Sequence, residues 1–158
     1  PLFPGVTRVI NYGLDKLRFP NAVRCGNRVR ARCVLLKIED VPGGLQMTEQ
    51  YTVHQEGAFP VVRPPPGSDV YMMGRVYMWW PMLELVKGET YRLHLSSIDL
   101  QHGFSLQPVN INLQVHPGYE MVVTMTPNQL GQFGIVCNEY CGFGHHTMTG
   151  RIYVVDNK

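Results

Sequence analysis

The sequence predicts an antiparallel all-β sandwich or barrel over residues 69–156, and three observations lead to this prediction. Short runs of strand-forming residues recur through this part of the chain, turn signals separate them, and no long helical period lies between them. The runs cover residues 70–78, 90–97, 109–115, 119–126, 134–136 and 151–155. The turn signals are Lys87-Gly88, His116-Pro117-Gly118 and Thr126-Pro127-Asn128.

Alternation of apolar and polar side chains shows which face of a strand is buried. Tyr91, Leu93 and Leu95 alternate with Arg92 and His94. The run over 111–115 alternates in the same way. We therefore expect one face of each strand to lie in the core and His94 to be an exposed strand residue, while His116 is expected in a turn.

A proline-rich segment over 62–68 divides the chain. Three consecutive prolines cannot continue a helix or a central strand, so this segment is expected to be a stiff linker or crossover. It separates an N-terminal extension, residues 1–68, from the β domain, residues 69–158. The extension has a mixed pattern, with a short helix expected over 11–19, a strand over 29–38 and a turn over 41–44. Cys25 and Cys33 lie in it, either bridged or as two free thiols.

Charge is sparse and unevenly distributed. Only 16% of the 158 residues are charged, below the roughly 25% of typical soluble domains, which suggests a surface partly hidden against a partner. Residues 1–40 hold eight of the 14 basic side chains and three of the 12 acidic ones. The acidic remainder suits a basic partner.

The alternating arginines over 28–32 are more typical of a strand face than of a nucleic-acid site. The most apolar stretch, residues 76–86, is too short and too interrupted to span a membrane.

Four soft-metal ligands lie within twelve positions of a glycine-bearing loop. Cys137, Cys141, His145 and Met148 follow one another with the spacing Cys-x3-Cys-x3-His-x2-Met. Thiolate, imidazole and thioether together form a ligand set for copper, whereas a thioether adds little to a zinc site.

A second cysteine distinguishes this pattern from a mononuclear blue-copper site, which needs one. Two thiolates can bridge two copper ions, and such a centre requires a second histidine, for which His102 is the candidate. Two simpler interpretations remain: a disulfide between Cys137 and Cys141, and a structural zinc site. Considered alone, Met148 would be interpreted as a core residue, and His102 as a polar residue with its hydrogen bonds made within the protein.

These motifs resemble the copper-binding domain of cytochrome c oxidase subunit II, which holds the dinuclear CuA centre. The resemblance covers residues 70–155 and is closest to the B-type bacterial oxidases. It rests on two motifs, Asp99-Leu100-Gln101-His102-Gly103-Phe104 and Cys137-Asn138-Glu139-Tyr140-Cys141-Gly142. The resemblance implies a cupredoxin-like Greek-key β-sandwich with an N-terminal extension that is partner- or membrane-proximal.

The resemblance also implies the role of each ligand. Cys137 and Cys141 bridge two copper ions, and His102 and His145 bind one ion each. Met148 and the backbone carbonyl of Glu139 are the axial ligands. The Glu139 carboxylate is then available to a Mg²⁺ ion at the boundary with subunit I, the alternative being an ordinary loop glutamate.

Several aromatic and polar residues near these motifs have two interpretations. The resemblance implies that Tyr77, Trp79 and Trp80 help electrons enter from the donor, whereas paired aromatics are equally typical of cores. Asp99 either orients His102 or holds a local turn. His146 is expected to face solvent or a partner. We expect three aromatic side chains to cover the ligand loop: Phe104, Tyr140 and Phe143.

The resemblance implies an oxidase component that accepts electrons from cytochrome c and passes them to haem in subunit I, where oxygen is reduced. Such a subunit lies on the extracytoplasmic side of an energy-transducing membrane and normally bears an N-terminal membrane anchor. One alternative is the CuA domain of a nitrous oxide reductase, which generally carries Trp at position 139 and an acid at 147, where this chain has Thr147. The other alternative is a non-enzymatic periplasmic copper or electron carrier.

Overall fold

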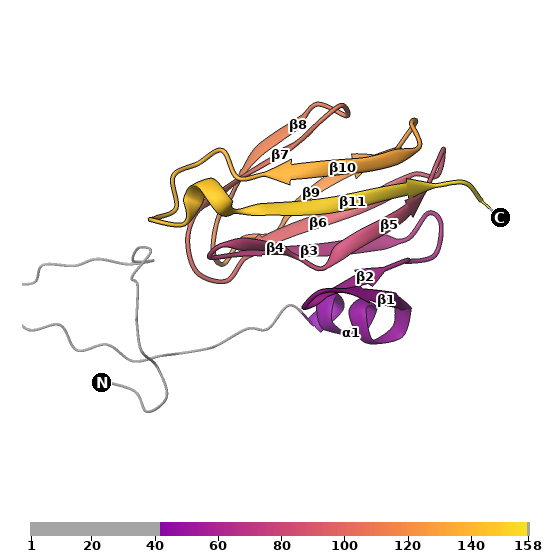
Figure 1. Ribbon diagram of the computed structural model, residues 1–158, viewed down its shortest axis with the longest axis horizontal. Coiled ribbons are helices and arrows are strands. Elements are labelled where there is room, and N and C mark those ends of the chain that lie inside the picture. The colour runs from indigo at the N-terminus through magenta and orange to yellow at the C-terminus, as the bar shows by residue number, and fades with distance from the viewer. Residues whose placement is uncertain (1–41, 158) are drawn as a thin grey trace, which may run out of the picture. The chain divides into compact units, whose positions relative to one another are not determined.

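The computed structural model describes residues 42–157 (Figure 1). The elements are α1 (Pro42–Tyr51), β1 (Thr52–Glu56), β2 (Phe59–Val62), β3 (Asp69–Arg75), β4 (Met78–Trp80), β5 (Met82–Val86), β6 (Tyr91–Ser97), β7 (His102–Leu106), β8 (Ile111–Val115), β9 (Met121–Met125), β10 (Gly131–Val136), the 3-10 helix η1 (His145–Thr147) and β11 (Thr149–Val155). The expected helix over 11–19, the strand over 29–38 and the pair Cys25 and Cys33 lie outside the described residues.

The strands form a mixed sheet that folds on itself into a sandwich (Figure 1). Its order is β1-β2-β5-β11-β4-β3-β6-β9, and β10 joins β11 to β7, which pairs with β8. The all-β prediction is confirmed, but the expectation of antiparallel pairing is incomplete, because β2–β5, β3–β6 and β5–β11 are parallel. Alternation reports which face of a strand is buried and not the direction of its neighbour.

The core lies between the layers of the sandwich. Burial alternates along β6 from Tyr91 to Ser97, as the sequence predicts, and along β3 beside it. Trp79 and Phe104 are fully buried and meet edge to face with ring centroids 5.1 Å apart. The ring of Trp79 also meets that of His102, so this part of the core adjoins the start of β7.

The segment before the prolines takes part in this sheet. β2 pairs with β5, and α1 packs on β3, where Met47 is buried. The turn predicted over 41–44 is wrong, since α1 begins at Pro42. Proline suits the first position of a helix, whose N–H has no partner there, and Gly43 lets the helix approach the ring of Tyr71.

The ligand motifs gather at one end of the sandwich. β7 begins at His102, and β10 ends at Val136, directly before Cys137. β4 and β11 meet there through Met78 and Thr149. Among the described residues, no helix is long and apolar enough to cross a membrane.

Candidate metal centre

The two cysteine side chains lie side by side at the base of the loop between β10 and η1. Both are buried and free, with their sulfur atoms 3.8 Å apart. A disulfide bond is about 2.05 Å long, so the disulfide interpretation fails for this pair. The backbone N–H of Cys137 donates to the carbonyl oxygen of Met148, which closes the loop at 3.1 Å.

His102 faces this pair from β7. Its side chain is fully buried, and its Nδ1 lies 4.0 Å from the sulfur of Cys137. Its other nitrogen, Nε2, donates to Oδ1 of Asp99 at 2.8 Å. A hydrogen bond at Nε2 fixes the tautomer that leaves the Nδ1 lone pair toward the sulfur.

Asp99 has both roles that the sequence left open. It orients His102, and it also accepts the backbone N–H of Leu100 at 2.6 Å and that of Val76 at 2.7 Å. Burial alone would raise the pKa of the Asp99 carboxyl, but the bonds from His102 and from the two backbone N–H groups outweigh it and lower the pKa. The carboxylate is therefore held in its charged form beside the imidazole.

His145 and Met148 approach the other cysteine. The Nδ1 of His145 and the Sδ of Met148 each lie 3.7 Å from the sulfur of Cys141. Met148 is buried, while the half-buried ring of His145 meets Tyr140 edge to face. This half of the site thus carries one imidazole and one thioether.

Glu139 contributes two different groups. Its carbonyl oxygen lies 3.2 Å from the sulfur of Cys137, on the half of the site that His102 faces. Its carboxylate points elsewhere and accepts a hydrogen bond from Gln114 at 2.8 Å. All six residues predicted as ligands are brought together: His102, Cys137, Glu139, Cys141, His145 and Met148.

The donor set fits a soft cation. The ligand atoms of His102, Cys137 and Cys141 lie within 4.8 Å of one another. Burial, together with the nearby charge on Cys137, raises the pKa of the Cys141 thiol to about 12. The Cys141 thiol therefore keeps its proton at neutral pH until a cation replaces it. Soft sulfur ligands with imidazole favour copper, and a thioether strengthens that preference.

Aromatic side chains divide between the core and the surface of the site. Phe104 is a core residue that packs against Trp79, whereas Phe143 is 95% exposed and Tyr140 is 76% exposed. The prediction that these two cover the loop is wrong. Because the ligand side chains of the short loop point inward, those between them turn outward. Trp79 is a core residue whose ring edge faces His102 at 6.0 Å.

Tyr77 and Trp80 are both half-buried, and only one of them is placed at the loop. The ring of Tyr77 lies against Gly142 and Gly144. Trp80 lies on β4, where it pairs with Met73 of β3.

Three further histidines lie outside the proposed ligand set. His146 is exposed, as predicted, and His116 lies in a turn closed by Tyr119. The expectation for His94 is wrong: its side chain is 15% exposed and lies between Asp69 at 3.0 Å and Glu120 at 3.2 Å. The ring of Tyr71, opposite His94 on β3, also stacks on the imidazole with centroids 4.7 Å apart. Alternation within one strand does not report such cover from its neighbour.

Three contacts that hold the loop were not predicted. Asn138 donates to Asn112 at 2.8 Å, as Gln114 does to Glu139, so the polar face of β8 fastens the loop. Gly103 leaves room for the loop, because a Cβ there would lie 2.0 Å from Oδ1 of Asn138. The signals in the sequence were the polar face of β8 and a glycine directly after His102.

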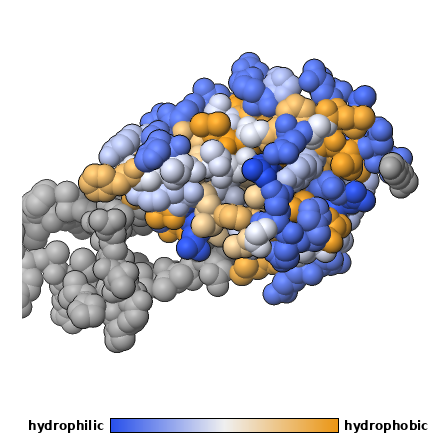
Figure 2. Space-filling view, in the orientation of Figure 1, coloured by the Kyte–Doolittle hydropathy of each residue, from blue (hydrophilic) through white to orange (hydrophobic). Residues whose placement is uncertain are grey.

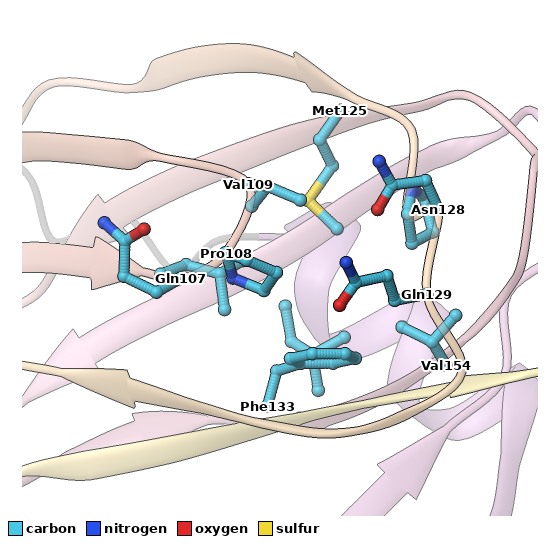
Figure 3. Close-up of a pocket in the computed structure, with 11 residues that line it drawn as sticks. Gln107, Pro108, Val109, Met125, Asn128, Gln129, Phe133 and Val154 are labelled. Atoms are coloured by element: carbon cyan, nitrogen blue, oxygen red, sulfur yellow. The ribbon is translucent and has the colours of Figure 1, made fainter.

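A separate pocket lies near the turns that precede β8 and β10 (Figure 3). Its empty volume is about 280 Å³, and Phe133, Met125, Val109 and the amide of Gln129 are among its walls. No cysteine, histidine or carboxylate lines it. The pocket therefore offers no metal site, and the chemistry of the described chain is concentrated at the sulfur pair.

A likeness to an enzyme covers about a third of the chain. The chain is 49% identical over 55 residues to 3-hydroxyacyl-thioester dehydratase Z of Mycobacterium tuberculosis, which is 34% of this chain and 36% of that protein. A match to about a third of an enzyme supports no statement about activity.

A longer likeness covers most of the chain. The chain is 35% identical over 122 residues to cytochrome c oxidase subunit 2 of Thermus thermophilus, covering 72% of this chain and 90% of that protein. Its fold is also similar to that of a solved structure, the periplasmic domain of subunit II of cytochrome oxidase of Bradyrhizobium japonicum, with a TM-score of 0.54. The two sequences are 18% identical, and the likeness covers 60% of this chain and 88% of that chain. No protein-family profile matches the chain.

Proposed function

The chain belongs to the cytochrome c oxidase subunit 2 family, and we propose that its buried sulfur pair holds a dinuclear copper centre. As a member of this family it is the subunit through which electrons enter a haem–copper oxidase. Its own task is electron transfer, and oxygen is reduced in another subunit.

The observation that supports two ions rather than one is the pairing of donors around the sulfurs. Cys137 and Cys141 lie between two sets, each with one imidazole and one weak donor. In this assignment, one ion has His102 and the Glu139 carbonyl, and the other has His145 and Met148. Copper bound in this way supplies one-electron uptake and release, shared between two ions.

Four of the six proposed ligand residues are buried: His102, Cys137, Cys141 and Met148. Both thiols would give up their protons on binding a metal, and Asp99 keeps the imidazole of His102 in one tautomer. Phe104 and Trp79 close the site from below, so water cannot reach His102. Ligands that do not move between oxidation states keep the reorganisation energy small. From this site we expect electrons to leave past His145 toward haem in subunit I.

We propose that the electron donor, cytochrome c or a similar small protein, docks on an apolar surface beside the loop. Figure 2 shows a small orange patch at the tip beside the place of η1 in Figure 1, with blue and pale-blue residues around it. Phe143 and Tyr140 project from the loop itself, and Ile98 is half exposed nearby, next to Asp99. Of the three aromatic residues proposed as the entrance for electrons, Tyr77 lies against the loop, Trp79 lies in the core beside His102, and Trp80 lies on β4.

The other oxidase subunits are the second class of partner. We propose that the Glu139 carboxylate binds Mg²⁺ at the boundary with subunit I, since a carboxylate is a hard oxygen ligand. Among the described residues no further acid joins it in a cluster, so the remaining ligands would come from subunit I or water. Loss of a bound Mn²⁺ spin signal from the oxidase on Glu139→Gln tests this.

We propose further that the N-terminal extension, residues 1–68, contacts the other subunits or lies near the membrane. It contains most of the basic side chains, and its last part, α1 to β2, packs on the sheet of the copper domain. We propose that the chain lies on the extracytoplasmic side of an energy-transducing membrane, and the likeness to a periplasmic domain supports this. Cross-linking from residues 1–68 within the purified oxidase tests the contact.

Metal analysis with absorption and electron-spin spectra of the purified chain tests the copper centre. We expect two coppers per chain and a hyperfine pattern from two equivalent ions, which Cys137→Ser or Cys141→Ser abolishes. Met148→Leu should keep both coppers and shift the reduction potential, whereas Met125→Leu, at the pocket, leaves the potential unchanged. A single zinc ion, or a Cys137–Cys141 disulfide without metal, contradicts the proposal, and a colourless Cu(I)-only protein would indicate a carrier.

A further inference from the structure

The turn between β3 and β4 places one aromatic side chain directly against the ligand loop. The ring of Tyr77 is half-buried and covers two glycines of that loop. A Cβ added at Gly144 would lie 2.2 Å from Cδ2 of Tyr77 and 2.5 Å from its Cε2. One added at Gly142 would lie 2.7 Å from the phenolic oxygen. The ring therefore fits only because neither position carries a side chain.

The two positions need glycine for different reasons. Gly142 has φ of +120°, a conformation that residues with a side chain rarely adopt, so its backbone alone explains the glycine. Gly144 has φ of −89° and ψ of 10°, which other residues tolerate. The three atoms nearest to a Cβ at Gly144 all belong to Tyr77. Contact with the tyrosine ring is thus what excludes a side chain at Gly144.

These glycines hold the part of the loop that carries His145. The carbonyl of Gly142 accepts the backbone N–H of His145 at 3.0 Å, and that of Gly144 accepts both the backbone N–H and the hydroxyl of Thr147. These bonds shape η1, from which the imidazole reaches to within 3.7 Å of the Cys141 sulfur. A shift of either glycine would therefore move the imidazole.

We propose that Tyr77 is a positioning residue for His145, acting through its ring on Gly142 and Gly144. The inference rests on the proposed copper centre, and it assigns Tyr77 a task that does not require electrons to pass through its ring. The phenolic hydroxyl is not needed for this task, whereas the ring is.

The test is a double-mutant cycle in the full chain, with copper release to a chelator and the copper hyperfine pattern as readouts. Changing a residue that supports a metal ligand typically costs 10–100-fold in metal affinity, so we expect about tenfold faster copper release for both Tyr77→Ala and Gly144→Ala. The double variant should release copper no faster than Tyr77→Ala alone, because the added methyl group then meets no ring. Tyr77→Phe and the exposed control Tyr119→Ala should match the wild type within about twofold.

Additive effects of the two substitutions would overturn the inference. So would a Tyr77→Ala protein that releases copper at the wild-type rate and only accepts electrons more slowly. Should Tyr77→Ala fail to fold, Tyr77→Leu enters the same cycle. If the wild type binds no copper, the proposed function fails, but melting temperatures of the metal-free variants still show whether Tyr77 and Gly144 are coupled.

Discussion

Removing the Asp99 carboxylate tests how strongly the fold orients its buried histidine. Asp99 accepts hydrogen bonds from Nε2 of His102 and from the backbone N–H groups of Val76 and Leu100. In Asp99→Ala all three donors lose their partner. Water can reach Val76, but it cannot reach His102, whose side chain is fully buried.

The expected loss follows from these three bonds. A hydrogen bond to a charged group contributes about 1.5–3 kcal/mol, and the buried His102 donor is left without any substitute. We therefore expect Asp99→Ala to lower the free energy of unfolding of the metal-free chain by about 2–3 kcal/mol and to weaken copper binding by about 10–100-fold. Asp99→Asn should lose less, because its amide oxygen can still accept from His102 and Leu100. Its NH₂ group, however, would face the N–H of Val76, so that two donors meet there and the hydrogen bond to Val76 is lost.

Chemical denaturation of the metal-free chain measures the first effect, and competition with a copper chelator measures the second. Asp156→Asn is the matched control, since Asp156 is exposed near the end of the described chain. If Asp99→Ala retained copper as well as this control does, the assignment of Asp99 as the residue that orients His102 would be refuted. If Asp99→Ala lost stability but kept its copper affinity, the only remaining role of Asp99 would be to accept the backbone N–H groups of Val76 and Leu100.

Three further predictions concern the loop, the core and the surface. Gly103→Ala should displace the loop through its clash with Asn138 and cost about 1–3 kcal/mol, seen as a lower melting temperature and incomplete copper loading. Phe104→Ala should cost about 3–5 kcal/mol in chemical denaturation, because the ring is fully buried. A hydrogen bond from Arg92 is the main cause that lowers the pKa of Asp69 in the folded chain. The Asp69 carboxylate therefore stabilises the fold at pH values above its unfolded pKa near 3.8. This stabilisation is lost as the pH falls through the lower pKa of the folded chain. Asp69→Asn should therefore flatten the acid side of the stability profile, and an unchanged slope in acid titration would contradict this.

The sequence predicted the ligand set because soft donors at fixed spacing have few other uses. Two cysteines, a histidine and a methionine in one short loop restrict the chemistry before any fold is known. His102, distant in sequence, was added by the resemblance and by the need for a second imidazole. Alternation likewise identified the buried face of β6. In both cases the prediction depends on residue type or on spacing along the chain, and neither requires knowledge of which residues lie nearby in the fold.

Strand direction and short strands could not be predicted in the same way. β5 and β7 were missed as strands: β5 follows Trp80-Pro81 directly, and β7 starts within the His102 motif. Nor could the exposure of Phe143 be foreseen, since an aromatic residue beside a metal site is typical both of a cover and of a docking surface. These properties depend on partners brought near by the fold.

Glycine shows where sequence and structure must be combined. Gly142 can be explained by its own backbone conformation, a property of the loop alone. Gly144 and Gly103 have no such local reason, and each is adjacent to a group from another part of the chain that occupies the space of a side chain. In a loop whose ligands must stay fixed while charge changes, such close backbone contacts replace side-chain packing. These contacts hold the loop backbone against the neighbouring residues, and a bound metal would hold the same loop through its ligand side chains.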